Sequence, residues 1–257
     1  MVSKMCRIAS MIVLATFAFS SAAWAATCSN ASLSGTYGFL HGGTAVNGTP
    51  TTSVSQITFD PTTAKFSSVD TSSHDGVITT ESLTGTYAVA SNCTATDNFT
   101  IGGGIAFVVT STGFFAGAGP RKGATADGFG VKQGSPTCTN AGVAGSFGFE
   151  ATGVLVAGAP ITGPVAFIGE LELSVDTSGD GVISGEMAGS EDGTIFSFVE
   201  EPVTGSYSVA TDCTGTATIT PKGRSALNFS FVVVDGGKEM LAIEMDADTV
   251  VSGTLQH

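Results

Sequence analysis

Hydrophobic and polar residues alternate along most of this chain with a period of two residues. Short segments such as SVSQITFD, GTYAVA and IAFVVTS are rich in Val, Ile, Thr and aromatic residues. Gly, Asn, Asp or Pro separates such segments at intervals of about 8–12 residues, which is typical of strands joined by tight turns. The 35 glycines would weaken helices almost anywhere. The pattern therefore predicts an all-β fold class built from antiparallel meanders.

One segment has a different pattern. KEMLAIEMDAD, at Lys238–Asp248, is the single helix candidate in the chain. The corresponding segment earlier in the chain, FFAGAGPRKGA, contains too many glycines for a helix, so we expect a strand there.

The chain contains a tandem duplication. CSNASLSGTYGF is followed later by CTNAGVAGSFGF, and LTGTYAVASNCTAT by VTGSYSVATDCTGT. SVDTSSHDGVIT likewise matches SVDTSGDGVIS, and FVVT matches FVVV. The repeats predict two units, at residues 27–134 and 137–257, each with about eight strands that close into a small barrel or fold into a sandwich. In this alignment the second unit has an insertion at 185–202.

The first 26 residues have the features of a cleaved signal peptide. Lys4 and Arg7 precede an apolar run, and Ala23-Trp24-Ala25 forms an A-x-A cleavage site. The residues before Cys28 lack the pattern of a lipoprotein box. We therefore expect a protein that is secreted, periplasmic or at the cell surface, with no membrane span after cleavage.

Four cysteines remain after cleavage. Their even number in an exported chain predicts two disulfides, and their spacing fits no zinc pattern. Each repeat contributes two cysteines at matched places, which favours pairing within repeats. The expected disulfides are Cys28–Cys93 and Cys138–Cys213.

The charge of the chain excludes some classes of partner. The net charge is −13, and cleavage of the signal peptide would remove two positive charges more. Nucleic-acid binding needs clustered Lys and Arg, so we expect no nucleic-acid partner. The hydrophobic content of 42% is high enough to fill a core.

The segment DTSGDGVISGE resembles a calcium loop. Asp176, Ser178 and Asp180 occupy alternate positions, as metal ligands do in an EF-hand. However, the twelfth position, which should hold a bidentate Glu, is Met187. An Asp-Gly hairpin turn is therefore favoured over a metal site.

The sequence shows no catalytic constellation. None of the three histidines, His41, His74 and His257, has a counterpart in the other repeat, and hydrolase, zinc-protease and nucleotide-binding motifs are missing. Glu170 and Glu172 would share a strand face, which favours a solvated surface over a glycosidase pair. We therefore expect no enzymatic activity and no cofactor.

Aromatic residues suggest two places for a ligand. Tyr37 and Phe39, and their counterparts Phe147 and Phe149, alternate and should point inward, where a filled core is favoured over a pocket. The 185–202 insertion adds weak candidate ligand-binding residues that have no counterpart in the first repeat: Phe196, Phe198 and Glu200.

The repeated blocks C-x4-[LV]-x-G-[TS]-[YF]-G-F and T-G-[TS]-Y-x-V-x3-C-T resemble an uncharacterised group of small secreted bacterial β-repeat proteins. This resemblance implies export and a β fold, with no known activity to transfer. The meander alone is loosely similar to calycin-like or dirigent-like barrels. We expect an exported, non-enzymatic module that binds a small apolar ligand or a surface partner. The alternatives are a structural or adhesive surface protein that meets glycans or other proteins and, less favoured, a secreted enzyme.

Overall fold

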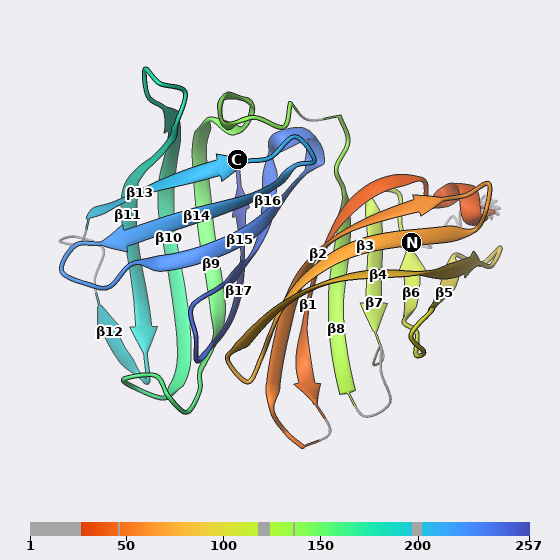
Figure 1. Ribbon diagram of the computed structural model, residues 1–257, viewed down its shortest axis with the longest axis horizontal. Helices are drawn as coiled ribbons and strands as arrows, with labels where there is room; N and C mark the ends of the chain where they lie inside the picture. Colours follow the sequence, from red (N-terminus) through yellow and green to blue (C-terminus); the bar gives the residue numbers. More distant parts are fainter. Residues whose placement is uncertain (1–26, 46, 118–123, 136, 197–201) are drawn as a thin grey trace, which may run out of the picture.

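The chain forms two antiparallel β-barrels that lie side by side (Figure 1). The computed structural model describes residues 27–45, 47–117, 124–135, 137–196 and 202–257. The all-β class is confirmed, and each repeat is a barrel rather than a sandwich. The predicted signal peptide lies outside the described residues.

The first barrel is a meander of eight strands in which each strand pairs with the next and β1 pairs with β8 to close the ring. A short 3-10 helix, η1 (Asn30–Ser32), precedes it. The strands are β1 (Gly35–Ala45), β2 (Pro50–Asp60), β3 (Lys65–His74), β4 (Val77–Val89), β5 (Thr94–Phe99), β6 (Ala106–Val109), β7 (Gly113–Gly117) and β8 (Ala124–Lys132).

The second barrel repeats this plan and closes through the pairing of β9 with β17. The short strand β12 pairs only with the end of β11. The elements are η2 (Asn140–Val143), β9 (Gly145–Leu155), β10 (Gly163–Val175), β11 (Gly181–Glu191), β12 (Thr194–Phe196), β13 (Pro202–Val209), β14 (Thr214–Pro221), β15 (Leu227–Val234), η4 (Asp235–Gly237), β16 (Glu239–Glu244) and β17 (Thr249–Gln256).

The helix expected at Lys238–Asp248 is wrong, because most of this segment is strand β16. Met240 faces the interior of the second barrel, and its neighbour Leu241 faces the first barrel. Both faces of the strand are therefore buried. A strand buried on both faces loses its alternation of apolar and polar residues, and its sequence then resembles that of a buried helix.

The repeated sequence blocks form the same hydrogen-bonded arrangement at one end of each barrel. The hydroxyl of Tyr87 donates to the backbone carbonyl of Asn30 at 3.2 Å, and the Asn30 side chain accepts the amide of Val89 at 2.8 Å. Asn140 makes the same two bonds in the second barrel, at 2.8 and 2.9 Å, with the tyrosine and valine of β13. Each asparagine thus ties the 3-10 helix that precedes its barrel to a tyrosine and a valine of the barrel wall.

Two disulfides fasten the closed ends. Cys28 is bonded to Cys93 and Cys138 to Cys213, as the repeat pattern predicts. Disulfides are typical of proteins outside the cytoplasm. In the part of the chain that the structure describes, no helix is long and apolar enough to cross a membrane.

The structure corrects the alignment of the two Asp-Gly segments. Asp75-Gly76 forms the two-residue turn between β3 and β4, and the Asp75 amide donates to the Pro50 carbonyl at 3.0 Å. Its counterpart in the second barrel is the turn between β11 and β12, where the Asp192 amide donates to the Pro164 carbonyl at 3.0 Å. The match between SVDTSSHDGVIT and SVDTSGDGVIS is therefore a match of composition and not of position.

The insertion expected at 185–202 is consequently wrong as well. Residues 185–191 belong to β11 and correspond to the second half of β3. The cysteines are separated by 65 residues in the first barrel and by 75 in the second. Part of this difference lies in the connection between the first and second strands, which has four residues between β1 and β2 and seven between β9 and β10. Loops tolerate such small changes without disturbing the barrel wall.

The barrels meet along an apolar contact surface, which we call the seam. The outer face of β1 and β2 packs there against the outer face of β15 and β16. Its buried residues are Leu40, Val54, Val232, Val234, Leu241 and Ile243. Outward-facing positions of a barrel are normally polar, so this surface joins the two barrels into one folded unit.

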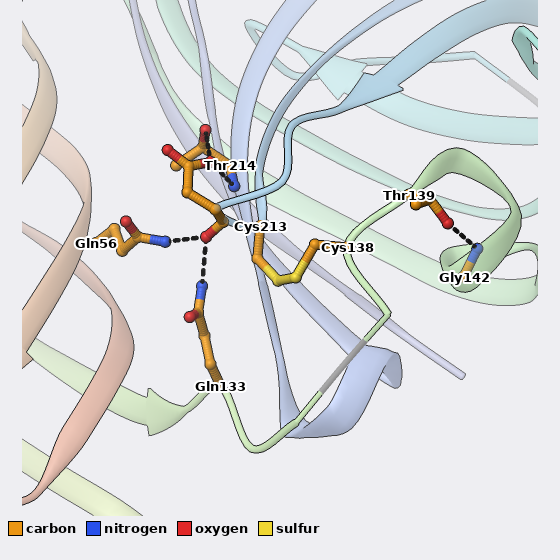
Figure 2. The surroundings of a disulfide bond; sticks show 8 residues. Gln56, Gln133, Cys138, Thr139, Gly142, Cys213 and Thr214 are labelled. Carbon is orange, nitrogen blue, oxygen red and sulfur yellow. Dashed lines mark hydrogen bonds between the residues drawn. A yellow bond between two sulfur atoms is a disulfide. The ribbon is translucent and has the colours of Figure 1, made fainter.

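Hydrogen bonds complete the seam. The side-chain amides of Gln56 and Gln133 both donate to the backbone carbonyl of Asp212, beside the Cys138–Cys213 disulfide (Figure 2). Elsewhere along the seam the Ser73 hydroxyl donates to the Thr249 carbonyl. The buried polar groups of the seam are therefore paired across the two barrels.

A side chain at Gly38 would not fit the seam. An added Cβ would lie 2.5 Å from Cγ1 of Val234. We expect Gly38→Val to destabilise the protein by about 1–3 kcal/mol, as overpacking generally does. Gly42→Val on the same strand is the control, because a Cβ there would meet its nearest neighbour at 3.7 Å. Equal thermal stability of the two variants would show that the seam is not tightly packed.

Candidate functional site

The interior of the first barrel contains a cavity of about 110 Å³. One part of its wall is aromatic, and the other part is polar. The aromatic part consists of Phe39, Phe59, Phe99, Phe107 and Phe114. The rings of Phe39 and Phe114 lie 5.2 Å apart, and those of Phe107 and Phe114 lie 5.4 Å apart. The expectation of inward aromatic side chains is confirmed, but they do not fill this barrel.

The polar part comes from the inner faces of β2 and β3. Alternate residues of a strand point to the same side, and here the inward positions carry hydroxyl, carboxyl and imidazole groups. Cross-strand pairs place these groups next to one another. We call this row the polar strip, and its residues are Thr51, Ser53, Ser55, Asp70, Ser72 and His74.

His41 on β1 adjoins the polar strip. Its Nε2 atom contacts the hydroxyl of Ser53 and lies 4.0 Å from a carboxylate oxygen of Asp70. Its Nδ1 atom is buried and has no hydrogen-bond partner among the described residues. Burial lowers the pKa of His41, and the nearby Asp70 carboxylate only partly opposes this shift. The imidazole is therefore neutral at neutral pH.

Two aspartates are buried at the cavity. The hydroxyl of Ser55 donates to Asp70, which is 8% exposed. Asp97 is 4% exposed, and one of its carboxylate oxygens accepts the amide of Ile105 at 2.6 Å. Burial raises the pKa of Asp97 to about 6, although this hydrogen bond acts in the opposite direction. At neutral pH the site therefore holds an ionised carboxylate at a cost in stability.

Ser53, His41 and Asp70 do not form a catalytic triad. In a triad the carboxylate binds one ring nitrogen and the serine the other. Here the serine and the aspartate both approach Nε2 of His41, and Nδ1 is buried without a hydrogen-bond partner among the described residues. This geometry does not suit activation of Ser53 as a nucleophile.

Strand register identifies the counterpart of Asp70 in the second barrel. Phe39 pairs with Ser55, which pairs with Asp70. The same chain of pairs from Phe149, the repeat equivalent of Phe39, ends at Met187. Met187 is 1% exposed and packs in the apolar core. One repeat thus has a thioether where the other has a carboxylate.

At two further positions the second barrel likewise has an apolar residue where the first barrel has a polar one. By the same register, His41 corresponds to Ala151 and Ser53 to Phe167, both of which belong to the apolar core. The space left in the core of the second barrel is only about 20 Å³, and apolar residues and Tyr207 line it. The two repeats therefore share one scaffold, and only the first has a polar cavity.

The residues singled out from the sequence lie elsewhere. Phe196 is in β12, where it corresponds to a position on β4 rather than to an insertion. Phe198 and Glu200 lie outside the described residues. The sequence pattern did not point to Ser53, Ser55, Asp70 or Asp97. The available signal was the polar character of inward positions, and the strand register needed to recognise them comes from the structure.

The segment resembling a calcium loop forms the turn between β10 and β11. The Asp176 carboxylate accepts the backbone amides of Ser178 at 2.8 Å and Asp180 at 3.0 Å. The expectation of a turn is confirmed, although the turn has five residues rather than the two of an Asp-Gly hairpin. Glu170 and Glu172 lie exposed on the outer face of β10.

Comparisons with known proteins give limited information. Neither a scan against protein-family models nor a search of curated proteins finds a match. One similar solved structure is a protein of unknown function from the DUF3598 family of Nostoc punctiforme PCC 73102, with 10% identity, a TM-score of 0.26 and coverage of 88% of this chain and 96% of that chain. Another is a candidate AttH of Nitrosomonas europaea, with 9% identity, a TM-score of 0.25 and coverage of 87% and 92%. Similarity at this level carries no argument about function. The chain is thus a disulfide-bonded tandem of two β-barrels, of which the first has a polar cavity.

Proposed function

We propose that this protein is an exported, non-enzymatic binding protein whose first barrel holds a small ligand with an apolar ring and one polar group. The observation that carries the proposal is the cavity in the first barrel, at the place where the second barrel is filled. Eight-stranded barrels have an interior just wide enough to be filled by side chains or to hold one small ligand. Each of these two outcomes is present in one repeat.

The energetics favour a functional role for the cavity. An unfilled cavity costs stability, and a buried carboxylate such as Asp70 costs more unless its oxygens are paired. The second barrel, with Met187 at the equivalent position, has neither a carboxylate at this place nor a cavity of this size on the same scaffold. A costly arrangement kept in only one of two repeats is typical of a site in which function opposes stability.

The size of the cavity limits the ligand. An apolar cavity of about 150 Å³ in another protein admits benzene, so the cavity of about 110 Å³ here limits the ligand to at most a single small ring or a short branched chain. The phenylalanine rings would contact the apolar body. The polar strip and His41 would hold the polar group.

A second candidate function is attachment to a surface partner. The outer face of β6 and β7 exposes apolar side chains, with Phe115 62% and Val108 50% exposed. Exposed apolar patches mark interaction sites in many proteins. Loss of a partner after Phe115→Ser, with ligand binding unchanged, would support this role.

Benzyl alcohol is a suitable probe for the cavity because it combines one ring with one hydroxyl. We expect it to shift the NMR signals of methyl and aromatic groups around the cavity, such as Ile57 and Phe114. Asp70→Met introduces the residue that the second barrel has at this place. We expect this variant to keep its fold, because Met187 is accommodated by the same scaffold, and to lose the binding.

The control is Val69→Met, one residue earlier on β3. Val69 is 46% exposed on the outside of the barrel, so this variant should bind like the wild type. The proposal fails if no ring-containing probe shifts the cavity signals. It also fails if Asp70→Met, shown to be folded, binds benzyl alcohol as well as the wild type.

A further inference from the structure

The outer face of β6 and β7 in the first barrel corresponds to the part of the second barrel that forms the seam. The amide of Val109 donates at 2.9 Å to the carbonyl of the second disulfide cysteine of its barrel, and Val233 makes the same bond at 2.9 Å in the second barrel. This shared bond aligns β6 with β15, so Val108 is the counterpart of Val232.

The strand partners of these valines correspond as well. Val108 pairs with Phe115 on β7, and Val232 pairs with Leu241 on β16. Val232 and Leu241 are 3% and 0% exposed, because the first barrel covers them in the seam. Their counterparts Val108 and Phe115 are 50% and 62% exposed. The first barrel therefore has an uncovered counterpart of this side of the seam, made of Val108 and Phe115, which we call the β6–β7 face.

The second barrel has an uncovered counterpart of the other side of the seam. In the seam Val232 and Leu241 lie against Gly38 of β1, where an added Cβ would be 3.1 and 3.3 Å from their side chains. Gly148 of β9 is the repeat equivalent of Gly38. Apart from its chain neighbours, a Cβ at Gly148 would come closest to the backbone oxygen of Gln256, at 3.8 Å. The space that is filled at Gly38 is thus open at Gly148.

A groove of about 800 Å³ surrounds Gly148 on the outer face of β9 and β10. Ile168 lines this groove and is 54% exposed. Strand register makes Ile168 the counterpart of Val54, which is 2% exposed in the seam. Glu150 stands at the position of Leu40, so this surface is more polar than the seam. We call it the β9–β10 face, made of Gly148, Glu150 and Ile168.

Exposure shows that the two faces do not meet within one chain. Val108, Phe115 and Ile168 would be covered if they did. Each face nevertheless complements the other as the two sides of the seam do, with large apolar side chains on one side and an unfilled glycine position on the other. A surface that fits a different surface of the same molecule joins copies of that molecule head to tail.

We propose that copies of this protein associate head to tail, with the β6–β7 face of one copy seated on the β9–β10 face of the next. Phe115 would fill the open space at Gly148, and Val108 would lie against Ile168. The polar residue Glu150 favours a reversible contact, because permanent interfaces are more apolar. This inference rests on the second candidate function, attachment through the outer face of β6 and β7, and names the partner as a second copy of this chain.

Sedimentation velocity of the disulfide-bonded mature protein at micromolar to millimolar concentrations tests the association. The wild type should form species larger than a dimer as its concentration rises, because a head-to-tail contact leaves one face free at each end. The chain has a net charge of −13, which opposes association. These species should therefore increase in about 0.5 M NaCl, which screens the repulsion between copies.

Two variants each remove one face. Phe115→Glu places a charge on the β6–β7 face, and Gly148→Leu fills the open space of the β9–β10 face. Each should weaken self-association at least about tenfold and keep the melting temperature of the monomer, because both side chains would point to solvent there. Ile195→Glu is the matched control and should associate like the wild type, since Ile195 is 81% exposed on β12, outside both faces.

A mixture of the two variants distinguishes a head-to-tail contact from a symmetric one. Phe115→Glu has an intact β9–β10 face and Gly148→Leu an intact β6–β7 face. The mixture should therefore form a one-to-one dimer that neither variant forms alone. A contact between two β6–β7 faces predicts instead that Gly148→Leu associates by itself, which would contradict the inference.

The outcomes also separate this inference from the proposed functions. A wild type that stays monomeric, or folded face variants that associate like it, would overturn the inference alone. The second candidate function keeps its own test, because Phe115→Ser can still abolish attachment to a different partner. Benzyl alcohol should bind Phe115→Glu as it binds the wild type, because Phe115 lies outside the cavity of the first barrel.

Discussion

Glu244→Gln is expected to stabilise the protein by about 3 kcal/mol at pH 7, and by more above pH 8. Glu244 lies on β16, is 2% exposed and faces the interior of the second barrel. Burial raises its pKa to about 8, with the carboxylates of Asp246 and Glu191 adding to the shift. The folded protein therefore holds the protonated acid at neutral pH.

The direction of the pH effect follows from the shift of this pKa. An ordinary glutamate releases its proton near pH 4.5, whereas Glu244 in the folded protein keeps it until about pH 8. Between these values the folded state binds more protons than the unfolded state, so stability contributed by Glu244 is lost as the pH rises. Glutamine cannot ionise, and its amide can donate to Asp246 as the protonated acid does.

Urea denaturation at several pH values between 4 and 9 measures this effect. The difference in stability between Glu244→Gln and the wild type should grow from about pH 4.5 to about pH 8 and then level off. Glu186→Gln, at an exposed position on β11, is the control and should show no such growth. A constant difference between Glu244→Gln and the wild type would contradict burial of this carboxyl.

Removal of the Cys138–Cys213 disulfide is expected to cost at least about 4 kcal/mol. The bond closes a loop between residues 75 positions apart, and its loss frees the unfolded chain from this constraint. A second cost comes from the seam. Cys213 follows Asp212, whose carbonyl binds Gln56 and Gln133 of the first barrel (Figure 2).

The first disulfide provides the comparison. Cys28 and Cys93 are 65 positions apart, so the chain-entropy cost of their removal is nearly the same, about 4 kcal/mol. We expect Cys138→Ala/Cys213→Ala to be less stable in denaturant than Cys28→Ala/Cys93→Ala, because only the former loosens the seam.

Hydrogen exchange distinguishes the two costs. The amide of Gly236 donates to the carbonyl of Gln133 across the seam at 2.9 Å. It should exchange faster in the variant without the second disulfide. Equal stability of the two variants, together with unchanged exchange at Gly236, would show that this disulfide acts within its own barrel only.

The features that depend on local pattern and chain order could be predicted. Alternating residues indicated strands, because the side chains of a strand point to opposite faces whatever its neighbours are. The inward direction of Phe39 and Phe149 followed from the same rule. The disulfide pairing followed from duplication, since each repeat had to contain its own pair.

The features that depend on strand register could not. Asp180-Gly181 resembles Asp75-Gly76 in sequence, but the true counterpart is Asp192-Gly193, and a turn signal does not state which two strands it joins. This similarity also produces the apparent insertion at 185–202, which contains Phe196. The sequence of β16 predicts a helix because the second buried face of this strand exists only when the two barrels are packed together.

The sequence by itself determined an all-β chain, its duplication and its two disulfides, because each of these is written in spacing along the chain. Only the tertiary structure decided that the meanders close into barrels, that a seam joins the barrels and that the first barrel contains a cavity. A cavity is a property of residues from many strands at once. Asp70 and Met187 occupy equivalent positions in the two repeats. Only the packing around each residue shows that Asp70 lines a cavity and that Met187 is part of a filled core.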